Sequence, residues 1–147
     1  MKNKIFWAIS LVSIIGLYAY NNPKVDFKED AKGGIQFNKD SWSNVLALAK
    51  KENKLIFLDI YATWCGPCKK LKKNTFANKK VGTYFNANFI NVTMDGEAGE
   101  GIGLSEKYKV SSYPSLYFIN GDGRIITMEE GYLNPSEILK FAKSVSK

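Results

Sequence analysis

The chain has 147 residues, enough for one folded domain with a short extension. Its net charge of +7 comes almost entirely from lysine, and Arg124 is the only arginine, so bidentate recognition of phosphates or bases is not expected and nucleic acid is not an expected partner. The absence of histidine excludes Ser-His, Cys-His and histidine-metal chemistry, and two cysteines are too few for a disulfide-stapled scaffold.

Residues 1–22 predict an export signal. Lys2 and Lys4 are followed by an uncharged, mostly apolar run from Ile5 to Tyr20, which is the layout of a secretory signal. The run is slightly shorter than a typical membrane span of about 20 residues, but no Ala-x-Ala cleavage pattern follows it. We therefore expect a hydrophobic helix that is retained as a membrane anchor, with the rest of the chain in the periplasm or outside the cell. Cleavage to a secreted protein and burial of the helix in the domain are the alternatives.

The remaining chain divides into a linker and a folded domain. Residues 23–34 are polar and contain Pro23 and the pair Gly33-Gly34, which is typical of a linker. Residues 35–147 carry the apolar patterns of a domain. The first of these predicts a helix within residues 38–54, with Asp40 as a plausible N-cap. Its apolar residues at helical spacing are Trp42, Val45, Leu46 and Ala49.

Strands and helices then alternate. The apolar run Leu55–Tyr61 predicts a strand that is buried on both faces. Helical segments follow from Cys65 to about Asn74 and around Val81–Phe85, and Phe89–Met94 predicts the next strand. Residues 96–103 are rich in glycine and predict a mobile loop rather than a phosphate-binding loop, because their two glutamates would repel phosphate.

The second half of the domain ends in a hairpin and a helix. After a short helix near Leu104–Lys109, the strands Pro114–Ile119 and Arg124–Met128 are joined by Asn120–Gly123, a strong hairpin signal. The last helix begins with a cap, a proline and a glutamate in the spacing of a capping box, followed by one apolar stripe. These residues are Asn134, Pro135 and Glu137, then Ile138, Phe141, Ala142 and Val145.

This order predicts an α/β fold, a central mixed sheet with helices on both faces. The pattern leaves open a further strand before the first helix.

The two cysteines form a C-x-x-C motif where a buried strand meets a helix. A thiolate on Cys65 would face the free N–H groups and the positive end of the helix dipole, which lower the pKa of a thiol. Pro67 fits the first helical turn, and Cys68 lies one turn on along the same face, where we expect it to be the more buried of the two. The pair can therefore close a bridge and carry out thiol-disulfide exchange.

Two other interpretations of the pair are weaker. A closed zinc site needs four ligands of the cysteine or histidine type, and the chain has only the two cysteines, so no metal is expected. A purely structural disulfide would close a very small loop and would therefore contribute little chain entropy.

The motif Trp64-Cys65-Gly66-Pro67-Cys68 resembles the active site of the thioredoxin family, and the resemblance extends over roughly residues 35–147. Asp59 lies six residues before Cys65, where thioredoxins carry a buried acid. Pro114 matches the proline that the family keeps in cis, and Gly131 matches the glycine before the last helix. The details are most similar to secreted thioredoxin-like domains, such as the C-terminal domain of transmembrane thiol reductases.

The resemblance implies a thioredoxin fold and a thiol-disulfide oxidoreductase that reduces protein disulfides. Such an enzyme is expected to need no cofactor beyond its own disulfide, and a membrane thiol reductase would supply its electrons. We expect a monomer. The alternative is a membrane-tethered binding module or chaperone of the same fold without redox turnover.

The resemblance also implies roles for individual residues. Cys65 is expected to be the nucleophile, Cys68 the resolving thiol, and Asp59 the group that moves the proton of Cys68, with a pKa raised by burial. Substrate contact is expected from Trp64, Gly66, Pro67, Tyr113 and Pro114, with the backbone of Tyr113 pairing with an extended substrate segment. Burial of Trp64 in the core is an equally open interpretation.

The sequence departs from the thioredoxin pattern in three places. Asn91 takes the position, counted back from Asp95, where thioredoxins carry a lysine beside the buried acid, so Asp59 is expected to lack its usual cation. The loop between Asp95 and Pro114 is longer than in cytosolic thioredoxins, so the partners of this protein are not expected to follow directly from theirs. Ser115 replaces a threonine after Pro114. The lysines that follow the motif predict a solvated helix face, with steering of acidic partners or thiolate stabilisation as the alternative.

Overall fold

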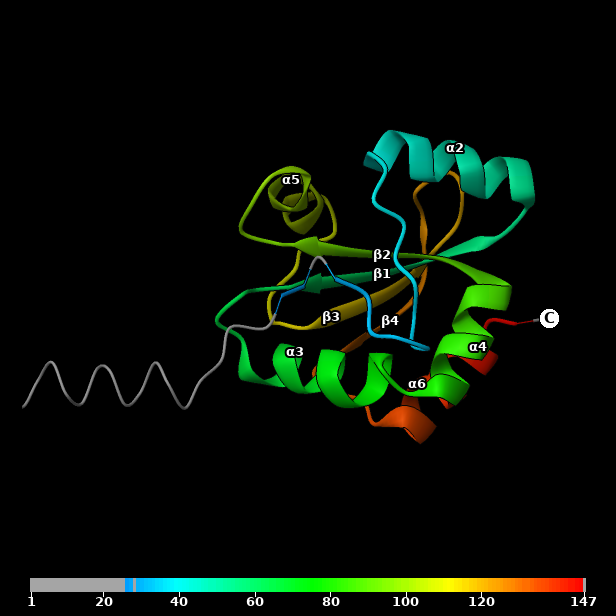
Figure 1. Ribbon diagram of the computed structural model, residues 1–147. Helices are drawn as coiled ribbons and strands as arrows, with labels where there is room; N and C mark the ends of the chain where they lie inside the picture. Colours follow the sequence, from blue (N-terminus) through cyan, green and yellow to red (C-terminus); the bar gives the residue numbers. More distant parts are fainter. Residues whose placement is uncertain (1–25, 28, 147) are drawn as a thin grey trace, which may run out of the picture.

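The computed structural model describes residues 26, 27 and 29–146, arranged around one four-stranded sheet (Figure 1). The predicted anchor, residues 1–22, lies outside the described residues. The strands are β1 (Leu55–Tyr61), β2 (Phe89–Asp95), β3 (Ser115–Ile119) and β4 (Ile125–Glu130), in the order β2-β1-β3-β4. β1 pairs parallel with β2 and antiparallel with β3, and β3 pairs antiparallel with β4. The sheet is therefore mixed, as the sequence predicts.

Helices cover both faces of this sheet (Figure 1). α2 (Trp42–Glu52) and α5 (Glu100–Lys107) pack on one face. α4 (Lys79–Asn88), α6 (Pro135–Lys143) and the π-helical η1 (Leu71–Phe76), which continues α3 (Gly66–Lys70), pack on the other. No helix in the part of the chain that the structure describes is long and apolar enough to cross a membrane.

β1 contributes side chains to both layers of the core, which explains its nearly continuous apolar sequence. Ile56 and Leu58 are fully buried against the α2 and α5 side, and Phe57 is fully buried against the α4 and α6 side. The ring of Phe57 meets that of Phe85 edge to face, with centroids 4.8 Å apart. Each such side chain contributes about 1.5–3 kcal/mol through burial, so β1 is anchored from both faces.

Several boundaries differ from the sequence-based prediction for local reasons. The N-cap of α2 is Ser41 and not Asp40, because the Ser41 hydroxyl accepts from the N–H of Asn44. α5 begins at Glu100, inside the stretch predicted as a loop, and ends before Lys109, which has a left-handed φ of 55°. Among the described residues no strand precedes α2, so the additional strand that the pattern left open is not found. The capping box of α6 between Asn134 and Glu137 is confirmed.

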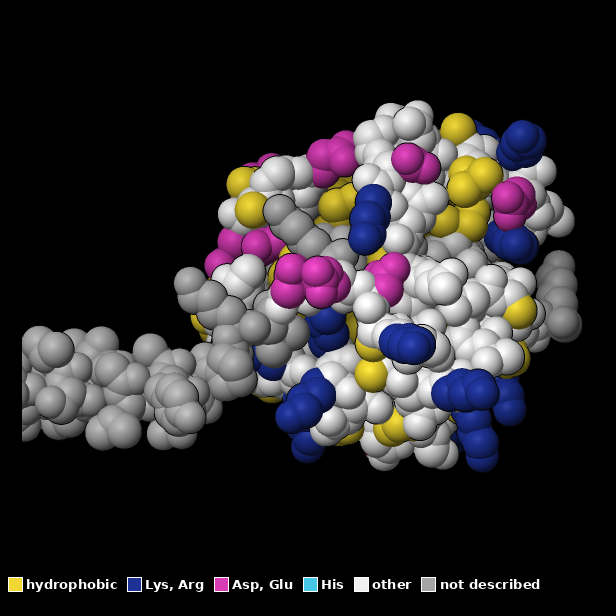
Figure 2. All heavy atoms as spheres, viewed as in Figure 1, with side chains coloured by type: hydrophobic (Ala, Val, Ile, Leu, Met, Phe, Trp, Pro, Cys, Tyr) yellow, Lys and Arg dark blue, Asp and Glu magenta, His cyan; other side chains and the backbone are white. Residues whose placement is uncertain are grey.

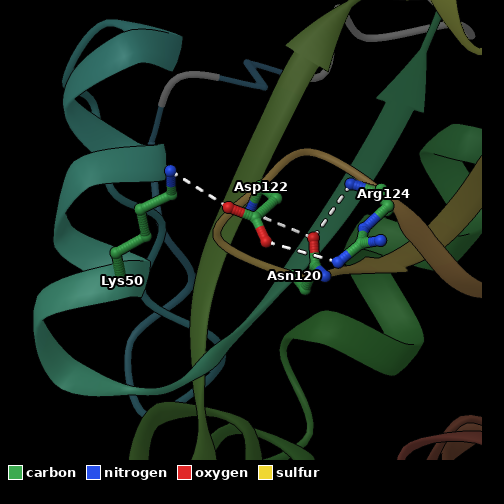
Figure 3. A network of polar contacts seen from close by, with 4 residues as sticks. All are labelled: Lys50, Asn120, Asp122 and Arg124. Carbon is green, nitrogen blue, oxygen red and sulfur yellow. Dashed lines mark hydrogen bonds and ion pairs between the residues drawn. The ribbon is translucent and has the colours of Figure 1, made fainter.

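The β3–β4 hairpin is closed by a polar network at the end of the sheet that lies away from Pro114 (Figure 3). The side chain of Asn120 accepts from the N–H groups of Asp122 and Arg124, at 3.0 and 2.9 Å. Asp122 in turn forms ion pairs with Arg124 and with Lys50 of α2. The network ties the turn to itself and to the neighbouring helix.

The charge of the molecule is unevenly distributed. On the face shown in Figure 2, acidic side chains gather over the α5 side and the middle of the molecule, and most lysines lie over the α3–α4 side. The net positive charge therefore does not form one continuous basic surface on this face.

Candidate active site

Cys65 and Cys68 form a disulfide with an S–S distance of 2.08 Å, at the point where the chain leaves β1 and enters α3. Cys65 is the N-cap of α3, and Pro67 lies in the first turn. The backbone N–H of Cys68 donates a 3.1 Å hydrogen bond to the sulfur of Cys65. The predicted bridge is confirmed. The sulfur of Cys65 also accepts a hydrogen bond from one of the N–H groups that have no partner within the helix, as the position of the motif suggested.

Burial does not distinguish the two cysteines. Each is only 2% exposed in the disulfide form, so the expectation that Cys68 is the more buried is wrong for this state. Both belong to a small cluster with Phe27, Tyr61 and Ala62. The asymmetry between the sulfurs therefore comes from the hydrogen bond to Cys65 and not from exposure.

Trp64 lies on the surface beside the disulfide. Its side chain is 67% exposed, which excludes the core interpretation. The indole N–H donates to Glu97 at 3.0 Å, and the ring meets that of Tyr113 edge to face with centroids 6.1 Å apart. The loop after β2 thus reaches Trp64 through Glu97, a contact that no pattern in the sequence predicted.

The segment before β3 forms the other side of the site. The peptide bond between Tyr113 and Pro114 is cis, as the resemblance implied. The carbonyl of Pro114 accepts from the N–H of Gly131 at 2.8 Å, and Tyr113 packs against the cysteine cluster. Gly66 is open, since no atom lies within 4 Å of the position that a Cβ there would occupy. The structure therefore brings Trp64, Tyr113 and the disulfide together on one surface.

Asp59 is buried on β1, the strand that leads to the disulfide, six residues before Cys65. It is 1% exposed, and burial raises its pKa to about 7, against smaller lowering effects of the Thr93 hydrogen bond and the charge of Lys72. The Thr93 hydroxyl donates to Oδ2 at 2.9 Å, and Oδ1 has no hydrogen-bond partner among the described residues. The expectation of a raised pKa is confirmed.

The predicted neighbour of Asp59 is wrong. Asn91 lies opposite Phe57 in the β1–β2 register, and its amide donates to the carbonyl of Gln36 and the side chain of Asn86. The residue opposite Asp59 is Thr93. Counting along one strand could not find it, because the register of a parallel pair is set by the packing of both strands.

A cation does lie near Asp59, and it is one of the lysines that follow the motif, which were expected to form a solvated helix face. Lys72 lies on η1, four residues after Cys68 and thus one helical turn along the same face. Its Nζ donates to the carbonyl of Glu29 and lies 5.5 Å from the ring of Phe27. Desolvation lowers the pKa of Lys72, and four carboxylates raise it, among them Asp59.

Phe27 brings the segment before the domain to the site. It is buried and stacks on Tyr61 with ring centroids 3.9 Å apart and an angle of 11° between the planes. Burial and nearby carboxylates raise the pKa of Tyr61 to about 12, so this phenol stays neutral at physiological pH. Among the described residues, no three His, Cys, Asp or Glu side chains form a group that could hold a metal ion.

A C-x-x-C disulfide at a strand-to-helix junction, a cis-proline segment beside it and a buried acid on the strand that leads to it define a thiol-disulfide oxidoreductase with a thioredoxin fold. The chain belongs to the Thioredoxin-like domain family, whose model matches residues 42–146.

Known relatives agree with this class. A proposed disulphide-isomerase from Bacteroides thetaiotaomicron, solved in solution, is 41% identical and has a TM-score of 0.68, with 81% of this chain and 98% of that one covered. Thioredoxin-1 of Drosophila melanogaster is 35% identical over 74 residues, covering 50% of this chain and 64% of the relative. The thiol:disulfide interchange protein DsbD of Pseudoalteromonas atlantica is 25% identical over 111 residues, covering 74% of this chain. The chain matches only 19% of the length of that DsbD protein.

Proposed function

We propose that this chain reduces disulfide bonds in proteins, with Cys65 as the nucleophile. The observation that carries the proposal is the hydrogen bond from the N–H of Cys68 to the sulfur of Cys65 at the start of α3. In the reduced protein the same donor and the helix dipole favour a thiolate on Cys65 over one on Cys68. A thiolate is the form that attacks a disulfide.

The reaction proceeds in two exchanges. The Cys65 thiolate attacks one sulfur of a substrate disulfide, the substrate S–S bond breaks, and the other substrate sulfur leaves as a thiolate. Cys68 then loses its proton and attacks the sulfur of Cys65, which releases the second substrate sulfur. The two cysteines lose two electrons and the substrate disulfide gains them.

Asp59 takes the proton of Cys68 in the second exchange. A carboxylate with a pKa of about 7 is suited to this step, because a general base works best when its pKa lies near the operating pH. The aspartate is buried on the strand that leads to the cysteines and has one oxygen without a partner among the described residues. The proton is transferred directly or through one water molecule.

The substrate lies on the surface formed by Trp64, Gly66, Pro67, Tyr113 and Pro114. Trp64 supplies exposed aromatic area, and Gly66 leaves open the space that a side chain would occupy between the two cysteines in sequence. An extended substrate segment pairs with the backbone of Tyr113, which precedes β3 and lies outside its ladder.

The direction and the electron donor are part of the proposal. The Gly-Pro pair between the cysteines resembles that of reducing thioredoxins, and the DsbD relative is named a thiol:disulfide interchange protein. We infer that a membrane thiol reductase returns electrons to the Cys65–Cys68 disulfide, and that the domain works as a monomer without a further cofactor.

The site of action follows from the first 22 residues. Their two lysines and apolar run support an anchor that leaves the domain, residues 35–147, on the periplasmic or outer side, tethered by residues 23–34. Separation of membranes from soluble fractions tests this. Recovery of a soluble species that starts near Tyr20 indicates a cleaved signal instead.

The reduction potential of the Cys65–Cys68 pair tests the direction. It is measured by equilibrating the full chain with glutathione mixtures and counting free thiols. A potential near that of thioredoxin, about −270 mV, supports reduction, whereas a value near the −120 mV of a strong oxidant contradicts it. A Cys65→Ser variant is the control, since binding without redox turnover would survive that change.

A further inference from the structure

Thr93 lies between Asp59 and a cavity at the edge of the sheet. Its hydroxyl donates to Asp59 Oδ2 at 2.9 Å, directly across the β1–β2 register. Thr93 also lines a cavity of about 310 Å³, together with Tyr61 and Met94. The cavity opens beside β2, an edge strand, and the segment before α2 forms its other wall through Asn38. Among the residues that the structure describes, Thr93 is thus the one that both bonds to Asp59 and borders this space.

Asp59 needs a route by which its proton leaves. At the cysteines themselves the protein is closed, since Ala62, Cys65 and Cys68 are each no more than 2% exposed. A proton taken from Cys68 cannot return the same way without reversing the reaction. A threonine hydroxyl can serve as such a route, because it accepts one hydrogen bond while it donates another.

We propose that the hydroxyl of Thr93 holds the carboxylate of Asp59 in place and passes its proton to water in the cavity between β2 and the segment before α2. This inference rests on the proposed role of Asp59 as the proton acceptor of Cys68. Thr93 is a positioning residue in this scheme, since it acts on the reacting sulfurs only through Asp59.

The proton balance is complete without another reactant. Asp59 takes the S–H proton of Cys68 while the mixed disulfide on Cys65 resolves, and the electron pair of the broken bond stays on the substrate sulfur. The Thr93 oxygen then accepts the proton of Asp59 and gives its own hydroxyl proton to water. Asp59 is left ionised for the next cycle, and the released substrate thiolate takes a proton from solvent.

Other titratable or charged groups face this region from several elements, and the test leaves them unchanged. They are Lys72 on η1, Cys68 on α3, Tyr61 on β1, Asp95 on β2, Asp26, Glu29 and Asp30 before α2, and around the cavity Lys39, Asp40 and Glu100. Because Thr93→Val replaces the hydroxyl with a methyl group and keeps the β-branched shape, a change in the pKa of Asp59 is assigned to the lost hydrogen bond.

The experiment compares Thr93→Val with Thr93→Ser in the full chain. The first readout is the titration of the Asp59 carboxyl by carbon NMR in the oxidised protein. The second is the single-turnover rate at which the mixed disulfide resolves, followed from pH 6 to 9. We expect Thr93→Val to raise the pKa of Asp59, because the bond stabilises the ionised form, and to slow resolution about 10-fold. Thr93→Ser should restore both, and Thr127→Val, a threonine on β4, should change neither.

The outcomes separate this inference from the proposed function. An unchanged pKa or an unchanged rate in Thr93→Val overturns the role of Thr93 while Asp59→Asn is still slow. If Asp59→Asn resolves as fast as the wild type, the proposed role of Asp59 fails, and the Thr93 inference fails with it. A loss of rate that Thr93→Ser does not rescue marks a packing defect and also overturns the inference.

Discussion

The sulfur of Cys65 and the backbone N–H of Cys68 are joined by a hydrogen bond of 3.1 Å, which makes the two cysteines chemically unequal although they are equally buried. Only the sulfur of Cys65 caps α3, so only Cys65 gains a stabilised thiolate when the bridge is reduced. We predict that Cys68→Ser accumulates mixed disulfides with substrate proteins, because the attacking thiol is intact and the resolving thiol is missing. Non-reducing gel electrophoresis after alkylation measures the trapped species, and Cys65→Ser is the matched control. Equal trapping by both variants would contradict the assignment of Cys65 as the nucleophile and Cys68 as the resolving thiol.

Asp59→Asn should slow turnover at neutral pH by about 10-fold or more, the range of general-base catalysis. The variant keeps the size of the side chain and its position opposite Thr93 but cannot take a proton. The rate with protein disulfides is compared from pH 6 to 9, because the difference should narrow as the solvent becomes basic enough to deprotonate Cys68. If Asp59→Asn turns over at the wild-type rate at pH 7, water and not Asp59 takes the proton of Cys68.

The stability of the oxidised protein should depend on pH through Asp59. Its pKa rises from 3.8 to about 7 on folding, so the folded state binds more protons than the unfolded state between these values. The free energy of unfolding should therefore fall as the pH rises from about 4 to 7, by roughly 4 kcal/mol at most, and level off above. Urea unfolding at several pH values measures this. Asp59→Asn should lack that decline and be more stable than the wild type at pH 8, and parallel curves for the two proteins would contradict the prediction.

Trp64→Ala should weaken substrate binding without loss of stability. The side chain is mostly exposed, so its removal should change the free energy of unfolding by about 0.5 kcal/mol or less. An aromatic anchor at an interface is worth roughly 2 kcal/mol, so KM for a protein disulfide should rise at least about 10-fold while kcat changes little. Ile102→Ala, an exposed apolar residue on α5, is the control. The same KM in both variants would exclude Trp64 from the substrate surface.

Asn120→Ala should destabilise the fold and leave the redox chemistry unchanged. Its side-chain oxygen accepts two backbone hydrogen bonds in the hairpin turn, and the loss should cost about 1–2 kcal/mol. The turn follows Ile119, at the opposite end of β3 from Pro114, so the rate per folded molecule should equal that of the wild type. Asn120→Asp keeps an oxygen that can accept both bonds and should be close to the wild type in thermal unfolding. A lower rate per folded molecule in Asn120→Ala would contradict the prediction, because it would mean that the hairpin turn affects the active site.

The fold class was predictable from local patterns. The apolar run Leu55–Tyr61 is recovered as β1 with the same ends, and the turn at Asn120–Gly123 joins β3 to β4 as predicted. The capping box at Asn134 starts α6. These features are encoded within a few neighbouring residues, through strand burial, turn chemistry and helix caps, so they can be found without knowledge of the tertiary contacts.

The sequence by itself also determined that Cys65 and Cys68 can form a bridge, because a spacing of one helical turn after a strand fixes their relative position. Only the tertiary structure decided what surrounds them. Thr93 and not Asn91 lies opposite Asp59, and Lys72 supplies the nearby charge from η1.

Glu97 holds Trp64 at the surface, and Phe27 closes the cluster over Tyr61. The pairs Trp64–Glu97, Asp59–Thr93 and Phe27–Tyr61 are each separated by more than 30 residues along the chain. Their contacts depend on the register between strands and on where loops return to the sheet, which are set by the packing of the whole core and not by any local spacing.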